Sequence, residues 1–139
     1  MFEKILIAND GSQGAQRALA AAINLAKSYG ANLHMISVEE LPRFAASIEE
    51  VVEEKADAEH RFEGVIVRAL GQAKAQGVTL ATHVVPGHAV PAIVELIERE
   101  HFDLLVVGFM GHSALYNRLI GSTTDRLVEH VPCNVLVVK

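Results

Sequence analysis

The chain has 139 residues, of which 50% are hydrophobic and 21% are charged. This length and composition fit one compact domain with a complete core and exclude a disordered chain. The formal net charge is -5 and the sequence has no basic tract, so binding to nucleic acid through phosphate neutralisation is not expected.

The sequence also argues against a secreted or membrane-bound protein. Residues 1–8 lack the basic start, apolar stretch and cleavage site of a signal peptide, and no apolar run reaches the about 18 residues of a membrane span. The single cysteine, Cys133, excludes an internal disulfide and is expected to be a small buried hydrophobe. We therefore expect a cytoplasmic protein with one domain over residues 1–139 and no membrane partner.

The first half of the chain alternates strand and helix patterns. Residues 4–8 form an apolar run that predicts a strand buried on both faces, and a polar turn follows at 9–12. Apolar residues then recur at helical spacing over 15–29, and residues 32–38 predict a second strand. A capping-box pattern at 47–50 predicts the start of a long helix.

The second half continues the alternation. Gly77 ends the long helix, and threonine and histidine side chains in the strand predicted at 78–85 indicate the edge of a sheet. The later elements are expected as a helix over 90–100, a strand over 103–107, a helix over 123–130 and a strand over 134–138.

This order of elements predicts an α/β fold with an open five-stranded parallel sheet and helices on both faces. The two most uniformly apolar strands that precede a glycine-containing loop are the first and the fourth. If these are central neighbours, the strand order is 3-2-1-4-5 and the winding reverses between them. Ligands of open α/β sheets bind at such a reversal, beyond the carboxyl ends of the strands, where both Asp10 and Gly108 are expected.

A spaced glycine motif lies between the fourth strand and the last helix. Gly108, Gly111 and Gly121-Ser122 follow the pattern G-x-x-G-x9-G-S, which differs from both the P-loop and the dinucleotide fingerprint. Glycine permits close approach of another group, and a helix start presents unpaired N–H groups, so the motif indicates a phosphate site. The alternative is a plain loop in which Ser122 and Asp125 cap the last helix.

Over its whole length the chain resembles the universal stress proteins of the single-domain type. The resemblance is carried by residues 5–12, Pro86-Gly87, residues 103–108, the glycine motif and residues 131–138. The motif spacing is that of the ATP-binding branch of the family. The resemblance implies a Rossmann-type fold like that of the adenine nucleotide alpha hydrolases, with ATP or another adenine nucleotide as ligand.

The resemblance also implies roles for individual residues. Asp10 would bind the ribose hydroxyls, with capping of the first helix as its alternative role, and the main chain of Val38 would recognise adenine. Mg²⁺ or Mn²⁺ is expected to bridge the phosphate oxygens without protein ligands, because the chain supplies little positive charge there. The histidines show no close metal-ligand spacing. The implied phosphate contacts are Gly108, Gly111, Gly121, Ser122 and Thr123, and further contacts are expected from Ala8, Gly87, His112 and Arg118, with His88 also a candidate for the crevice.

The chain departs from the family at the phosphate loop. The family often carries an arginine between the first two glycines and another after the second, where this chain has Phe109-Met110 and His112. Arg118 is a candidate substitute, and a solvated surface arginine is its alternative role. The departure leaves open whether ATP is preferred over ADP or AMP.

The resulting functional expectation is a stress-response sensor or regulator whose nucleotide occupancy alters its conformation or an unidentified protein partner. No acid–base pair or activated nucleophile is visible in the sequence, so an efficient enzyme is not expected, while slow ATP hydrolysis stays open. The alternative is a dimeric interaction module of the same fold with weak or no nucleotide binding. Met110 and His112 are the residues that separate the two hypotheses.

The last strand predicts a homodimer. Residues 134–138 are nearly all apolar, yet the predicted order places them at a sheet edge, which invites pairing with a second copy. The resemblance implies the same antiparallel contact. The expected interface residues are Val135, Leu136 and Val137.

Overall fold

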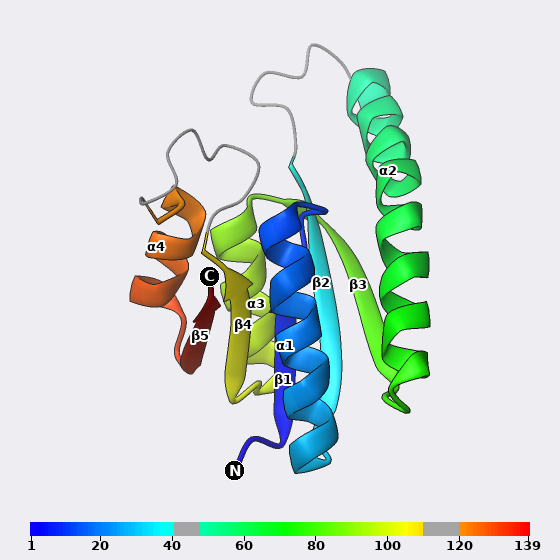
Figure 1. Cartoon of the computed structure of the whole chain (residues 1–139). Helices are drawn as coiled ribbons and strands as arrows, with labels where there is room; N and C mark the ends of the chain where they lie inside the picture. The colour runs from blue at the N-terminus through cyan, green and yellow to red at the C-terminus, as the bar shows by residue number, and fades with distance from the viewer. Residues whose placement is uncertain (41–47, 110–119) are drawn as a thin grey trace.

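The computed structural model describes residues 1–40, 48–109 and 120–139. Strands and helices alternate strictly in these ranges (Figure 1). In chain order they are β1 (Lys4–Ala8), α1 (Gln13–Tyr29), β2 (Asn32–Glu40), α2 (Ile48–Ala75), β3 (Leu80–Gly87), α3 (Ala89–Glu100), β4 (Leu104–Gly108), α4 (Ser122–His130) and β5 (Asn134–Val138).

The strands form one parallel five-stranded sheet in the order β3-β2-β1-β4-β5, which confirms the predicted fold class and strand order. β1 lies in the centre, where Ile5 pairs with Leu33 of β2 on one side and with Leu104 of β4 on the other. Ile5, Leu6 and Ile7 are all 0% exposed, as expected for a strand covered on both faces. β3 and β5 form the two edges.

Helices cover both faces of the sheet, and successive side chains of each strand point to opposite faces. Ile5 and Ile7 join a core beneath α1 and α2, whereas Leu6 joins a second core beneath α3 and α4. Figure 1 shows α1 in front of the sheet and α3 behind it. None of the helices in the described ranges combines the length and the hydropathy needed to span a bilayer.

α1 begins at a side-chain cap and ends at a left-handed glycine. The Ser12 hydroxyl oxygen accepts a hydrogen bond from the Ala15 N–H at 3.2 Å, and Gly30 adopts a φ of 64° at the other end. Small buried residues at helical spacing allow the helix to approach the sheet closely. These residues are Ala15, Ala18, Ala22 and Ala26.

The structure differs from the sequence prediction mainly at the ends of elements. β2 is two residues longer than expected, to Glu40, and β3 continues through Pro86, which an edge strand tolerates. The start of the predicted capping box at Ser47 lies outside the described residues. A 28-residue helix is about 42 Å long and an eight-residue strand about 26 Å, so α2 extends beyond the sheet (Figure 1).

The overhang leaves Val52 exposed, whereas Leu70 lies on the outer side of α2 beside the buried Ala69. Phe62 and Ala69 are buried over the sheet, whereas Val52 is 60% exposed and Leu70 is 41% exposed. Tyr29, at the end of α1, is also half-exposed and packs edge-on against Phe2. The spacing of apolar residues therefore predicted the helices correctly but overestimated how much of each helix surface is buried.

Gly108, at the end of β4, packs closely against the main chain at the start of α1. A Cβ added at Gly108 would lie 2.8 Å from the Gly14 carbonyl carbon and 3.2 Å from the Ala15 nitrogen. Both are main-chain atoms, which cannot rotate out of the way as a side chain can. The first glycine of the motif is therefore required for packing, independently of any phosphate.

We expect Gly108→Ala to lower the free energy of unfolding by about 1–3 kcal/mol, because the added methyl group must displace the main chain of α1. Gly71→Ala is the matched control, since an added Cβ there meets nothing within 4 Å. It lies inside α2 and is expected to raise the free energy of unfolding by about 0.5–1 kcal/mol. Urea unfolding followed by circular dichroism measures both; a Gly108→Ala protein as stable as wild type would contradict the packing argument.

Candidate functional site

A cleft with a volume of ≈ 540 Å³ opens at the carboxyl end of the sheet, where the chain leaves the paired strands β1 and β4 toward opposite faces. Its walls come from the ends of β1, β2 and β4, the starts of α1, α3 and α4, and Phe62 of α2. Of the residues predicted from the sequence, the structure brings Ala8, Asp10, Val38, Gly108, Gly121, Ser122 and Thr123 together in this lining.

Other predicted residues are placed differently. Gly87 ends β3 opposite Glu40 and does not belong to the lining of the cleft. Gly111, His112 and Arg118 lie outside the described residues. Their expected phosphate contacts remain predictions.

The turn after β1 is held by a network of hydrogen bonds centred on Asn9. Its main-chain N–H donates to the Ile36 carbonyl at 2.9 Å, and its own carbonyl accepts from the Ser37 hydroxyl at 2.7 Å. The Asn9 side-chain oxygen accepts from the Gly11 N–H at 2.9 Å. These bonds tie the turn to β2 and fix the position of the next residue, Asp10.

Asp10 is exposed at the cleft and shapes the turn that leads into α1. One carboxylate oxygen accepts from the Ser12 N–H at 3.0 Å, and Ser12 in turn caps the helix. The alternative role of Asp10 as the helix cap is therefore wrong. A carboxylate beside a capped helix start remains in position to accept hydrogen bonds from a ligand in the cleft.

The start of α4 is tied to the end of β4. The Gly121 N–H donates to the Phe109 carbonyl at 2.9 Å, and the Thr124 hydroxyl donates to the Gly108 carbonyl at 2.8 Å. Gly121 is the N-cap and makes no side-chain capping bond, so the interpretation of Ser122 as a cap is wrong. The first N–H groups of α4 therefore face the cleft with the positive end of the helix dipole.

Val38 presents its main chain to the cleft. Strand residues two apart direct their N–H and C=O groups to the same side. The Ile36 carbonyl points toward β1, where it accepts from Asn9, so the N–H and C=O of Val38 point the same way. β1 ends at Ala8, opposite Ile36, and Val38 lies beyond this last pair.

A smaller hollow with a volume of ≈ 350 Å³ adjoins the cleft and adds residues that the sequence analysis missed. Arg126 and Thr123 both line it, one helical turn apart on α4. Glu40 caps α3: one of its carboxylate oxygens accepts from the Ala89 N–H at 3.2 Å and the other lies 3.1 Å from His88 Nδ1. The three-residue spacing of Thr123 and Arg126 at a helix start was the available signal for Arg126.

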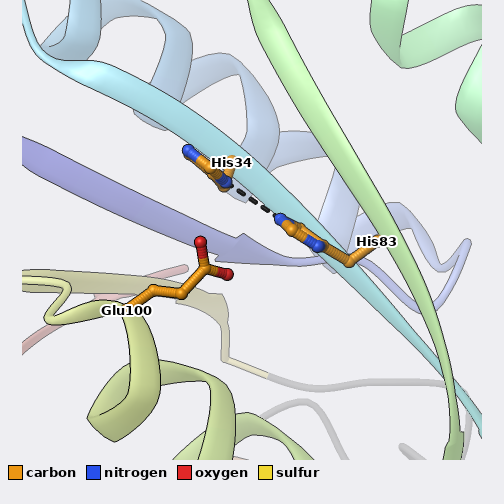
Figure 2. Close-up of side chains that lie close together, drawn as sticks. All are labelled: His34, His83 and Glu100. Carbon is orange, nitrogen blue, oxygen red and sulfur yellow. Dashed lines mark hydrogen bonds between the residues drawn. The ribbon is translucent and has the colours of Figure 1, made fainter.

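A second polar cluster lies on the face covered by α3, away from the cleft (Figure 2). His34 Nδ1 and His83 Nε2 are 2.9 Å apart, and Glu100 lies beside them. Among the described residues, these three form the one group of histidine, cysteine and carboxylate side chains whose ligand atoms lie close enough together, within 4.8 Å, to share a metal ion. The two histidines are 49 residues apart in the sequence, so ligand spacing along the chain could not reveal them.

Comparison with known proteins identifies relatives that match nearly the whole chain. The model of the universal stress protein family matches residues 1–139. Universal stress protein MJ0531 of Methanocaldococcus jannaschii is 32% identical, over 100% of this chain and 83% of its own. The solved structure of UspA from Lactobacillus plantarum superposes with a TM-score of 0.89 at 26% identity, over 99% of this chain and 98% of its own.

A second solved structure, of a universal stress protein in complex with cAMP, superposes with a TM-score of 0.77 at 27% identity. The superposition covers 99% of this chain and 97% of that one.

Proposed function

The chain belongs to the universal stress protein family, and we propose that it is a regulator whose cleft binds an adenine nucleotide. Residues 1–139 would act as one domain, and nucleotide occupancy would alter its interaction with a protein partner. The observation that carries the proposal is the placement of Asp10, the Val38 main chain and the glycine-capped start of α4 around one cleft.

The adenine end of the ligand is assigned to β2. The N–H and C=O of Val38 offer one donor and one acceptor beyond the end of β1, which suits the edge of an adenine ring. Apolar side chains provide the faces that a flat base requires. Those lining the cleft include Ile36, Phe62, Ala89 and Ile93.

Asp10 is assigned to the ribose. Its carboxylate is exposed at the cleft, and carboxylate oxygens accept hydrogen bonds from the two hydroxyls of a sugar diol. The turn around Asn9 fixes this carboxylate before the ligand arrives, which lowers the entropic cost of binding.

The phosphates are assigned to the start of α4. Gly121 leaves the first N–H groups of the helix without a side-chain cap, and Ser122 and Thr123 add hydroxyl donors. None of the described residues that line the cleft is a lysine or arginine, so Mg²⁺ or Mn²⁺ bridging the phosphates would supply positive charge. Arg126 in the adjoining hollow is a second source of charge for the outer phosphates.

A binding function is favoured over turnover by the same lining. The described residues of the cleft include Asp10, Glu40 and several hydroxyl side chains, and none of them is a histidine or a cysteine. The related protein solved with cAMP also supports an adenine nucleotide as the ligand class. The alternative, an interaction module of the same fold with weak or no nucleotide binding, is separated by the first experiment below.

Mg²⁺-ATP should raise the melting temperature of the wild-type protein, because a ligand that binds the native state adds about 2.7 kcal/mol to the free energy of unfolding at 100 times its Kd.

Asp10→Asn retains an oxygen for the Ser12 N–H and removes the charge offered to the ribose. We expect it to weaken nucleotide binding by about 1.5 kcal/mol, roughly tenfold, with little change in the melting temperature of the free protein.

Glu98→Gln is the control for Asp10→Asn, since it makes the same charge change at an exposed position on α3. Isothermal titration calorimetry gives both affinities. No heat and no thermal shift at millimolar ATP in the wild type would favour the interaction module.

Arg126→Gln should weaken ATP binding more than AMP binding, because its charge is assigned to the outer phosphates. We expect the binding free energy of ATP to weaken by about 1 kcal/mol, which is roughly fivefold in Kd, and that of AMP to weaken less. Arg99→Gln on α3 serves as the control, since Arg99 is exposed and lies 3.7 Å from Glu95. Equal losses for the two nucleotides would place Arg126 away from the outer phosphates.

We also propose a homodimer through the open edge of β5. Leu136 is 37% exposed there, and Val135 and Val137 are half-buried. The Val138 carbonyl accepts from Phe109 beside β4, so the neighbouring Val137 directs its N–H toward the open edge. A second copy can pair with this row of main-chain groups by a two-fold axis.

Val137→Pro removes a donor from that edge and should shift the mass measured by light scattering from dimer toward monomer, or cause precipitation. Val137→Thr keeps the N–H and the β-branched shape, so it should remain dimeric. A wild-type protein that stays monomeric at high micromolar concentration would refute the β5 contact.

A further inference from the structure

The edge strand β3, its neighbour β2 and the end of α3 bring His83, His34 and Glu100 together (Figure 2). The register of β2 and β3 pairs Ile36 with His83, so both histidines lie on the face covered by α3. Glu100 is the last residue of α3. One ligand atom from each of the three side chains lies within 4.8 Å of the others.

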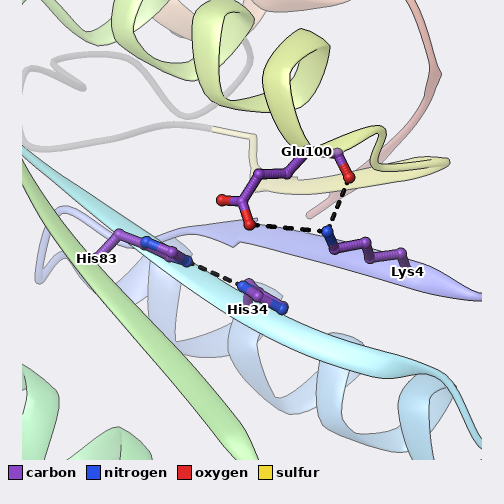
Figure 3. Close-up of polar contacts among 4 residues, drawn as sticks. All are labelled: Lys4, His34, His83 and Glu100. Atoms are coloured by element: carbon purple, nitrogen blue, oxygen red, sulfur yellow. Dashed lines mark hydrogen bonds and ion pairs between the residues drawn. The ribbon is translucent and has the colours of Figure 1, made fainter.

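The surroundings hold this group in place (Figure 3). The His34 and His83 rings are stacked with centroids 5.2 Å apart, and the edge of the Phe102 ring packs against His34 at 5.0 Å. Lys4 Nζ donates to the Glu100 carbonyl at 2.7 Å and lies 3.7 Å from its carboxylate. The three side chains are half-buried, so solvent reaches the group.

We propose that His34, His83 and Glu100 form a Zn²⁺ site that ties the edge strand β3 to β2 and α3. Two imidazole nitrogens and one carboxylate oxygen are a donor set that Zn²⁺ favours, with water in the fourth position of a tetrahedron. Ca²⁺ and Mg²⁺ prefer oxygen ligands and are disfavoured by two nitrogens.

The site needs only small side-chain adjustments to accept the ion. With Zn–N bonds of about 2.0–2.1 Å, two nitrogens of a tetrahedral site lie about 3.4 Å apart. His34 Nδ1 and His83 Nε2 therefore need to separate by about 0.5 Å from their present 2.9 Å. The Glu100 carboxylate must move inward, which rotation of its half-exposed side chain allows.

Protonation also fits the ion. Burial, together with electrostatic repulsion from the neighbouring His83 and Lys4, lowers the pKa of His34 below the usual histidine value and so favours the neutral ring that a metal ligand must be. In the metal-free pair, one ring carries the proton of the hydrogen bond at the shared nitrogens. Zn²⁺ requires lone pairs at both nitrogens, which a tautomer change of that one ring provides.

Lys4 sets the strength of the site. Its ammonium competes with Zn²⁺ for the Glu100 carboxylate and repels the ion. When the carboxylate turns away, Lys4 keeps the Glu100 carbonyl and its position 4.7 Å from the centre of the Phe102 ring, so it is not left without contacts. The geometry therefore points to an exchangeable ion, bound at micromolar free Zn²⁺, rather than to a permanently held one.

The experiment titrates Zn²⁺ into full-length, tag-free protein after removal of metal with a chelator. Calorimetry should give one ion per chain, and the melting temperature should rise, since the ion binds the native state. Co²⁺ in place of Zn²⁺ should give the intense visible absorption of a four-coordinate site. In NMR spectra of the wild-type protein, the side-chain nitrogen signals of His34 and His83 should be the ones that shift on Zn²⁺ addition.

His83→Gln removes a ligand from the edge strand and should lower Zn²⁺ affinity by about 100-fold, with Glu100→Gln also weakening it. His60→Gln is the matched control, because His60 Nδ1 lies 3.3 Å from Glu63 on the exposed face of α2 and this site has a single histidine. It should bind Zn²⁺ as the wild type does. The proposal is overturned by a wild type that binds no Zn²⁺ below millimolar concentration, by equal affinity in His83→Gln and wild type, or by shifts confined to other histidines.

Discussion

The structure depends on the handedness of its strand connections. A crossover between parallel strands is right-handed, so a chain that moves from β1 toward β3 places its helices on one face of the sheet. The chain then returns to β4 on the other side of β1, and this reversal puts α3 and α4 on the opposite face. The loops that follow β1 and β4 must diverge, which opens the cleft between Asp10 and Gly108.

The three helices that start at the cleft differ in how their first N–H groups are capped. Ser12 caps α1 with its hydroxyl, and Glu40 caps α3 with a carboxylate. α4 begins at Gly121, which makes no side-chain capping bond. An anion is therefore attracted to α4 in particular, while the carboxylates of Asp10 and Glu40 on the other walls repel it.

Much of this arrangement could be predicted from the sequence because it depends on local patterns. Uninterrupted apolar runs identified strands covered on both faces, and the more polar strand around His83 was correctly placed at an edge. The lining of the cleft by Asp10 and Gly108 followed from the strand order. The cap of α1 was harder to assign, since Asp10 and Ser12 both fit the pattern and only the hydrogen bonds separate them.

Other features depend on contacts between distant segments. His34 and His83 meet because β2 and β3 pair in one particular register, and a shift of one residue would turn one ring to the opposite face. The packing role of Gly108 depends on how closely α1 approaches β4. Neither the register nor the helix distance is encoded in a short sequence pattern.

The parallel fold also separates charge between its two ends. Each of the first four strands is followed by a helix, so helix starts and their partial positive charge collect at the carboxyl end of the sheet, and helix ends with partial negative charge collect at the amino end. The basic residues in the last turns of the helices complement this polarity: Lys27, Lys74, Arg99 and His130.

Lys4 binds the last carbonyl of α3 for the same reason, beside the two histidines and the Glu100 carboxylate. A cation at this place is attracted by the end of the α3 dipole as well as by the carboxylate. An anion at the opposite end of the sheet is attracted by the start of α4. The parallel arrangement therefore favours the proposed phosphate site at one end of the sheet and the proposed metal site at the other.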